Sequence, residues 1–163
     1  MTKNKKPTGP VVFLYNIRSV HNAGAIMRTA DGIGASTVIF GGYTPSPIDR
    51  FGRPRQDFIK QSLGSEKSIV WESAPQALIR LRALKKLGYR LIAVEQARGA
   101  VDYKKVKVSK DKTVFILGNE PKGLPASVIS LADSIIEVPM YGEKESLNVS
   151  VAAGIVLYRL FDR

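Results

Sequence analysis

Three segments of the sequence place polar residues where an apolar run gives way to a loop or to a helix. They are residues 16–31, 114–125 and 135–158. Open α/β sheets bind their ligands at the carboxyl ends of the strands, where such transitions occur. These segments are therefore the first candidates for chemistry.

The first segment combines an amide with a guanidinium group. Asn22 lies where we expect a helix to begin, a position that suits an N-cap. Arg28 lies on the face opposite the apolar residues Ala23, Ile26 and Ala30. Taken alone, the segment fits a solvated helix charge as well as it fits a functional arginine.

The other two segments end apolar runs with small or polar residues. In the second, a strand leads directly into Gly118, Asn119 and Glu120, which form either an ordinary turn or a ligand-binding loop. In the third, Ser146 and Asn148 precede an apolar helix, and Ser146 is expected to be its N-cap.

The sequence excludes several kinds of catalytic site. It contains no cysteine, so disulfides and thiolate chemistry are ruled out, and a single histidine, His21, is too little for a Cys/His zinc site. No metal site is therefore expected. The glycines of residues 118–123 are spaced like those of a P-loop, but Leu124 stands where the lysine should be.

Composition and charge describe a globular domain with a polyanionic partner. The 163 residues carry 25 Lys and Arg against 14 Asp and Glu, a net charge of +11. Such a charge favours RNA or DNA first and an anionic membrane second, with solubility as the plain alternative. Residues 1–10 are expected to be a basic, flexible arm before a single domain at 11–163. We expect a cytoplasmic protein, since no apolar stretch is long enough to span a bilayer.

The order of apolar patterns predicts an α/β domain with a parallel sheet, because strand-like runs alternate with helical periodicity. The predicted strands are residues 11–15, 36–40, 68–71, 90–95, 113–117 and 134–138. The predicted helices are residues 23–33, 75–88, 126–132 and the stretch from Leu147 to the end. A long loop rich in proline is expected between the second and third strands.

That loop contains a basic stretch, residues 50–60, in which cations alternate with aromatic rings. Cations beside rings suit phosphates and exposed bases of single-stranded or looped RNA. Alternatively, Phe58 and Ile59 anchor the loop to the core. The proposed RNA-binding residues are Arg50, Arg53, Arg55 and Lys60, together with the rings of Phe51 and Phe58.

The last helix is apolar on every side rather than along one stripe, from Leu147 to Phe161. A helix of this kind must be buried all round, and in so small a domain a second subunit covers it most easily. The pattern therefore predicts a homodimer.

Taken together, the three segments resemble the three motifs of the SpoU/TrmH family of RNA 2′-O-ribose methyltransferases in the SPOUT superfamily. The matching stretches are residues 22–30 (NAGAIMRTA), 117–120 (LGNE) with 123–124 (GL), and 138–140 (VPM) with 146–153 (SLNVSVAA). The resemblance extends over essentially the whole chain from Val11.

The resemblance implies a parallel sheet with helices on both faces, a C-terminal deep trefoil knot, and a homodimer paired through the knot and the last helix. It also implies S-adenosylmethionine as the cofactor, held mainly by the backbone of three loops. The cofactor-binding residues that it implies are Leu117, Gly118, Val138, Met140, Leu147 and Asn148.

By the same resemblance Arg28 is the catalytic residue, with Asn22, Glu120, Ser146 and Asn148 around it. Because a guanidinium stays protonated in proteins, we expect Arg28 to orient the substrate and stabilise charge rather than to act as a base. Glu120 either accepts a structural hydrogen bond or holds Arg28.

The implied substrate is tRNA or rRNA, and the chain is expected to be close to the bare catalytic core. The alternatives are an RNA base methyltransferase and a non-catalytic RNA-binding module on the same fold.

Overall fold

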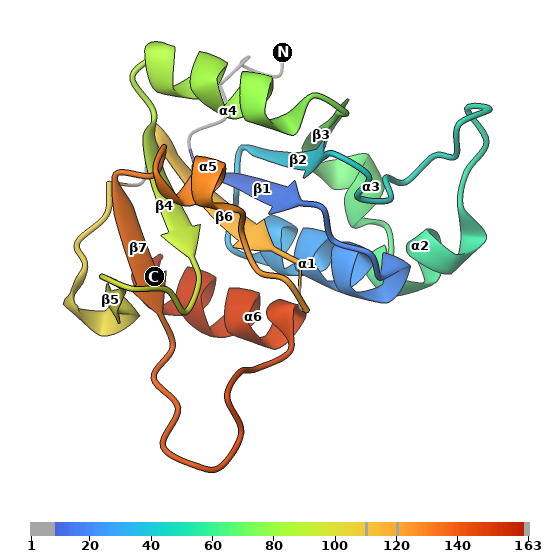
Figure 1. Ribbon diagram of the computed structural model, residues 1–163. Coiled ribbons are helices and arrows are strands. Elements are labelled where there is room, and N and C mark those ends of the chain that lie inside the picture. The colour runs from blue at the N-terminus through green and yellow to red at the C-terminus, as the bar shows by residue number, and fades with distance from the viewer. Residues whose placement is uncertain (1–8, 110, 120, 162–163) are drawn as a thin grey trace.

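The computed structural model describes residues 9–109, 111–119 and 121–161. Within them lies one seven-stranded sheet in the order β3-β2-β1-β6-β4-β7-β5, and every pair of neighbouring strands runs parallel (Figure 1). The predicted α/β class with a parallel sheet is thus confirmed. Along the chain the strands are β1 (Val11–Tyr15), β2 (Thr37–Gly41), β3 (Val70–Ala74), β4 (Arg90–Val94), β5 (Val101–Asp102), β6 (Thr113–Gly118) and β7 (Ser134–Glu137).

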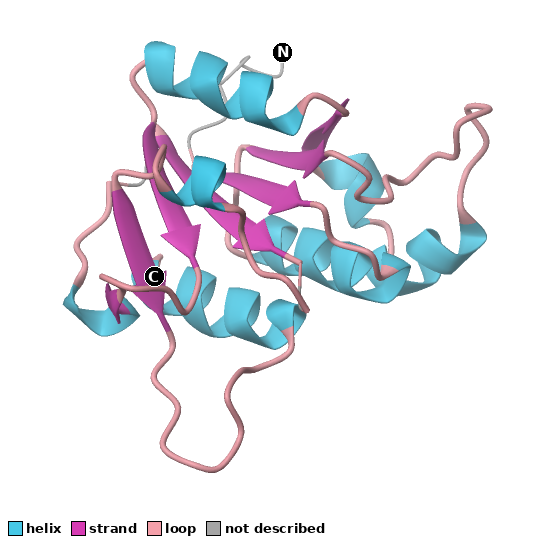
Figure 2. Ribbon diagram, in the orientation of Figure 1, coloured by secondary structure: helices cyan, strands magenta, loops and turns pink. Residues whose placement is uncertain are grey.

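The helices cover both faces of the sheet (Figure 2). On one face, α1 (Val20–Gly32) and α6 (Val149–Leu160) share a core with Phe58 of α2 (Gln56–Ser62). On the other face lie α4 (Ala77–Lys86) and α5 (Ala126–Ile129). The described residues also form two shorter elements, the helix α3 (Ser65–Ser68) and the 3-10 helix η1 (Tyr103–Lys105).

Strand β1 shows how the sheet separates the two cores. Val12 and Leu14 belong to the core under α1 and α6, whereas Val11 and Phe13 belong to the core under α4. Side chains alternate between the faces of a strand, so a strand covered on both faces is apolar throughout. The uninterrupted run at residues 11–15 thus reflects its place between β2 and β6.

The segment after β2 differs from its prediction as a plain loop, because it contains α2 and α3. Phe58 of α2 is fully buried, and its ring centroid lies 5.6 Å from that of Phe40. The predicted strand at residues 68–71 begins later, at Val70, because Ser68 closes α3. None of the helices among the described residues is long and apolar enough to cross a membrane.

Both predicted N-caps are wrong. The side chain of Ser19 caps α1 by accepting a hydrogen bond from the backbone N–H of Asn22 at 3.2 Å, so Asn22 lies inside the first turn. The side chain of Asn148 caps α6 by accepting from the backbone N–H of Ser150 at 2.8 Å, and Ser146 lies in the preceding loop. In each helix a free backbone N–H of the first turn is satisfied by a neighbouring side chain, Ser19 in place of Asn22 and Asn148 in place of Ser146.

Candidate functional site

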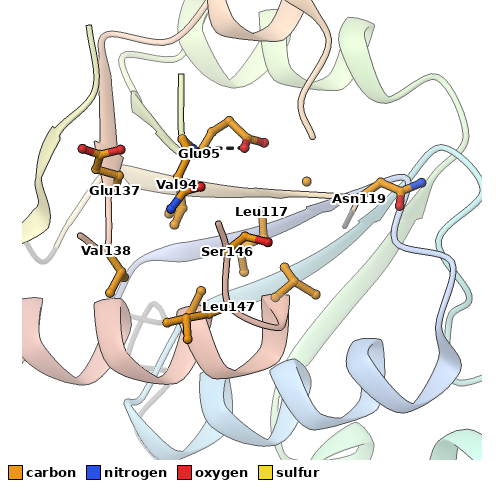
Figure 3. A pocket seen from close by; sticks show the side chains of 12 residues that line it. Val94, Glu95, Leu117, Asn119, Glu137, Val138, Ser146 and Leu147 are labelled. Carbon is orange, nitrogen blue, oxygen red and sulfur yellow. Dashed lines mark hydrogen bonds between the residues drawn. The ribbon is translucent and has the colours of Figure 1, made fainter. Parts of the chain in front are cut away.

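A pocket opens at the carboxyl ends of β4, β6 and β7, beside the first turn of α6 (Figure 3). It contains about 600 Å³ of space, part of it open to solvent. Its lining consists of Val94, Glu95, Gln96, Leu117, Gly118, Asn119, Glu137, Val138, Ser146, Leu147, Val149 and Ala152.

The position of the pocket follows from the topology. The helix after β1 covers one face of the sheet, and the helix after β6 covers the other, although β1 and β6 are neighbours. The connections therefore diverge between these two strands, which leaves a crevice at their carboxyl ends. The pocket lies along this edge, from β6 toward β4 and β7.

The loop after β6 is held close to the sheet. A side chain on Gly118 would bring its Cβ to 2.8 Å from Cγ of Leu124, so only glycine permits this approach. The backbone N–H of Leu124 donates to Oε2 of Glu95 at 2.8 Å, and that of Gly123 donates to the carbonyl of Asn119 at 2.8 Å. Glu95, which sequence analysis did not single out, is thus a support of the pocket wall. Glu95 follows β4 directly. Because open α/β sheets bind ligands at the carboxyl ends of their strands, the sequence offered the same signal for Glu95 as for Gly118.

The structure brings the first and third segments of the sequence together. Nδ2 of Asn148 donates to Oδ1 of Asn22 at 3.2 Å, which links the start of α6 to the first turn of α1. Because Leu147 lines the pocket and Asn148 follows it, this hydrogen bond fixes one wall of the pocket.

The residues expected to bind the cofactor fall into two groups. Leu117, Gly118, Val138 and Leu147 line the pocket, and so does Ser146 from the expected catalytic set. Met140 and Asn148 are not part of the lining. Glu120 lies outside the described residues.

Arg28 is not in this pocket. Its exposed side chain borders a second, broader depression, which it shares with Asp31 of its own helix, Gln61 of α2 and Tyr158 of α6. A catalytic role for Arg28 therefore stays a prediction, and a single subunit does not bring its guanidinium to the pocket.

The basic loop presents cations around one exposed ring. Phe51 is 66% exposed, and the guanidinium carbons of Arg50 and Arg53 lie 4.7 Å and 5.0 Å from its centroid. The two other proposed RNA contacts, Arg55 and Lys60, lie at the start of α2 and within it. Phe58 is buried in the core, so the alternative that it anchors the loop is correct, and Phe58 is not free to stack on a base.

The carboxylate of Asp49 organises this loop. Its Oδ1 accepts the backbone N–H groups of Phe51 and Arg53 at 2.8 Å and 2.9 Å, and its Oδ2 lies 3.1 Å from Nε of Arg53. The hydrogen bond from the Arg53 backbone, reinforced by that of Phe51 and by the Arg53 guanidinium, lowers the pKa of Asp49 below its usual value.

The described residues contain no cluster of His, Asp and Glu that could hold a metal ion.

The sequence model of the SpoU rRNA Methylase family matches residues 9–158. The chain belongs to this family. Among SpoU relatives, the tRNA (guanosine(18)-2′-O)-methyltransferase of Aquifex aeolicus is 32% identical over 154 residues, which cover 94% of this chain and 69% of the relative. The 23S rRNA (guanosine-2′-O-)-methyltransferase RlmB of Neisseria meningitidis is 30% identical over 147 residues, which cover 90% of this chain and 56% of the relative.

A solved SpoU-like structure has the same arrangement of elements. The AdoMet-bound rRNA methyltransferase of Sinorhizobium meliloti superimposes with a TM-score of 0.82 at 30% identity, covering 96% of this chain and 57% of that one. Its sheet and helices therefore correspond to nearly all of the fold described above.

Proposed function

We propose that this chain transfers a methyl group from S-adenosylmethionine to a ribose 2′-hydroxyl of tRNA or rRNA. The observation that carries the proposal is the pocket itself, because the second and third sequence motifs of the SpoU family meet in its walls at the carboxyl ends of parallel strands. The relatives named as 2′-O-methyltransferases support the type of reaction, and the AdoMet-bound structure supports the identity of the cofactor.

The pocket suits this cofactor chemically. Half of its twelve lining residues are apolar, and two carboxylates, Glu95 and Glu137, are among the others. Apolar walls exclude water, and the carboxylates favour a positively charged ligand. Leu117, Gly118, Val138 and Leu147 would hold the cofactor, with Met140 and Asn148 adjoining. When bound, S-adenosylmethionine supplies an electrophilic methyl group on a cationic sulfur.

The protein must then align the acceptor and help it to lose a proton. Transfer would replace the O–H bond of the ribose by an O–CH3 bond, with the proton passing to water and the sulfur leaving as the neutral thioether S-adenosylhomocysteine. Ser146 and Asn119 are polar side chains of the motifs in the pocket wall, and Asn22 is linked to that wall through Asn148. These groups would orient the ribose. Arg28 would bind a phosphate and stabilise the developing negative charge on oxygen, with Glu120 as its partner or as a hydrogen-bond acceptor.

A homodimer completes the proposal. Val151 and Tyr158 of α6 remain 49% and 56% exposed, and the depression that contains Arg28 adjoins Tyr158. Pairing of two chains through this face would cover these apolar side chains and would place Arg28 at the interface.

We also propose that the loops after β6 and β7 form the deep trefoil knot expected from the family. Family membership supports it, as do the contacts of both loops with the one pocket.

The test is incubation of the purified protein with labelled S-adenosylmethionine and RNA from a strain that lacks the gene. The RNA is then digested to nucleosides and analysed by mass spectrometry. We expect a 2′-O-methylated nucleoside, and mapping its position identifies tRNA or rRNA as the substrate. A methylated base would instead support the base methyltransferase, and absence of any methylated nucleoside would support a non-catalytic RNA-binding module.

A further inference from the structure

Tyr43 is an exposed aromatic residue that is attached directly to the wall of the pocket. Its side chain is 60% exposed, yet its hydroxyl accepts a hydrogen bond of 2.8 Å from Nδ2 of Asn119. Asn119 is itself buried and lines the pocket, on the opposite side of the view from Glu137 and Val138 (Figure 3). The ring therefore lies at the edge of the pocket with much of its surface free.

The backbone under Tyr43 is built to hold it there. Gly42 adopts a φ of +65°, and a side chain at this position would overlap Oδ1 of Asn16. That same oxygen accepts the backbone N–H of Tyr43 at 3.3 Å. On the other side, the hydroxyl of Thr44 donates toward the carbonyls of Leu14 in β1 and Gly41 in β2, and accepts the backbone N–H of Ile17 at 3.0 Å. The turn is thus fixed to the ends of two strands.

The position of Tyr43 in the sheet defines where its ring lies. It follows β2, whereas Asn119 follows β6, and β1 lies between these two strands. Neighbouring strands are about 4.8 Å apart, so Tyr43, Asn119 and the hydrogen bond between them together span roughly 10 Å along the carboxyl edge of the sheet. It consequently lies across the end of β1, at the crevice where the connections diverge.

Tyr43 also begins the segment that carries the exposed cations. Residues 43–55 run without interruption from the pocket edge to Phe51 and to the guanidinium groups of Arg50 and Arg53. An RNA strand whose phosphates lie on these arginines can reach the pocket along this segment. The first ring beside the pocket along this path is that of Tyr43.

We propose that Tyr43 stacks on the base of the nucleotide to be methylated and so positions its ribose at the mouth of the pocket. This inference rests on the proposed function. A base carries its ribose directly, so fixing the plane of the base restricts where the 2′-hydroxyl can lie. The bond to Asn119 holds the ring in place beforehand, which reduces the entropy lost on binding. Every base has a flat face, so this contact positions the nucleotide without selecting its identity.

The test compares two replacements of Tyr43 with one distant control. Tyr43→Leu removes the flat ring but keeps an apolar side chain, and Tyr43→Phe keeps the ring but removes the hydroxyl. Ile79→Ala is the control, because Ile79 is also 60% exposed but lies on α4. The probe is RNA from the strain that lacks the gene. Its dissociation constant is measured at several salt concentrations, with methyl transfer and cofactor affinity on the same preparations.

We expect Tyr43→Leu to weaken RNA binding by about 5- to 150-fold, the range typical of one aromatic–base stack. The slope of log affinity against log salt should not change, because no phosphate contact is lost. Cofactor affinity should stay within about twofold of wild type, since a base stack contributes to RNA binding alone. Tyr43→Phe should lie within about threefold of wild type in RNA affinity, because the stack is kept, and Ile79→Ala should match wild type.

Three outcomes would overturn the inference. Unchanged RNA affinity in Tyr43→Leu would mean that no base stacks on the ring. Loss of cofactor affinity would make Tyr43 a structural support of the pocket. Equal losses in Tyr43→Phe and Tyr43→Leu would assign the effect to the hydroxyl. Failure of the proposed function is distinguishable, because wild-type protein would then bind RNA without methylating it, and the binding comparison would still decide the role of Tyr43.

Discussion

Asn148 and Asn22 are joined by a hydrogen bond of 3.2 Å, although 126 positions of the sequence separate them. The same Asn148 side chain caps α6 through Ser150. The amide of Asn148 therefore makes two hydrogen bonds with different atoms. Its oxygen accepts the backbone N–H of Ser150, and its nitrogen donates to Asn22 of the first motif.

This division of tasks predicts different effects for two substitutions. Asn148→Ala removes the cap and should lower the free energy of unfolding by about 1 to 2 kcal/mol. Asn148→Asp keeps an oxygen for the cap but cannot donate to Asn22. It should therefore keep the stability that the cap contributes and lose only that of the hydrogen bond to Asn22, about 0.5 to 1.5 kcal/mol. It should also bind S-adenosylmethionine more weakly than wild type, because one wall of the pocket is less well fixed. Thermal unfolding and calorimetry measure both. If Asn148→Asp bound the cofactor normally, the link to Asn22 would be unimportant for the pocket.

The sequence predicts the centre of the sheet well, because burial on both faces is what makes a run of residues apolar without interruption. Strands β1 and β6 are covered on both faces, so they are recognisable as uninterrupted apolar runs, and β1 has the predicted bounds. The segments of the pocket were also predictable, since polar residues after buried strands gather at one edge.

Other features depend on contacts that the sequence does not reveal. The seven residues of α2 form a helix against the core, and the packing of Phe58 on Phe40 stabilises it. The roles of Glu95 and Tyr43 depend on strand order, because each bridges strands that are not consecutive in the chain. No local pattern specifies which strand becomes the neighbour of β6.

The basic loop makes a prediction about salt. Arg50 and Arg53 are the exposed cations around Phe51, whereas Arg55 is half-buried at the start of α2. Replacing Arg50 and Arg53 together by Ala should reduce the slope of log RNA affinity against log salt by about 1 to 2, because each phosphate contact contributes about 0.7 to 0.9. The control is Arg82→Ala with Lys86→Ala on α4, which removes the same charge. An equal change in the control would mean that net charge, and not this loop, determines the slope.

Asp133 predicts how stability depends on pH. Burial raises the pKa of its carboxyl, but the hydrogen bond from the backbone N–H of Leu91 and the contact with Lys85 outweigh this effect and lower it. A lowered pKa in the folded state stabilises the fold above the unfolded value of about 3.9, and the effect disappears as pH falls through the folded value. Asp133→Asn should therefore melt below wild type at pH 6, and the difference should shrink toward pH 3. A difference that is constant with pH would contradict this prediction.

The homodimer is tested on α6. Val156 is fully buried within the chain, so a charge there would disrupt the fold itself. Tyr158 is exposed, and Tyr158→Glu should leave the subunit folded while shifting wild-type dimers to monomers in sedimentation velocity. The matched control is Leu87→Glu, because Leu87 is similarly exposed but lies at the end of α4. A wild-type monomer that binds the cofactor would refute the dimer.

Arg28 provides the sharpest test of the catalytic assignment. If it stabilises charge that develops only in the transition state, its loss should lower the rate of methyl transfer and leave ground-state binding nearly intact. Arg28→Ala should therefore fold and bind S-adenosylmethionine, yet methylate about 10²- to 10³-fold more slowly, as when one preorganised donor is removed. Arg28→Lys should recover little activity, because an ammonium lacks the planar fork that contacts phosphate and hydroxyl together.

The measurement is single-turnover methylation of the RNA in which the modified nucleotide has been mapped, with cofactor affinity determined by calorimetry. Arg82→Ala is the control, because Arg82 is also an exposed helix arginine but lies on α4. Arg28 borders the depression beside Tyr158 and not the pocket, so its effect should also depend on pairing. In the Tyr158→Glu monomer, Arg28→Ala should cause little further loss. If Arg28→Ala methylates within a few-fold of wild type in the dimer, Arg28 is a solvated helix charge and another group stabilises the transition state.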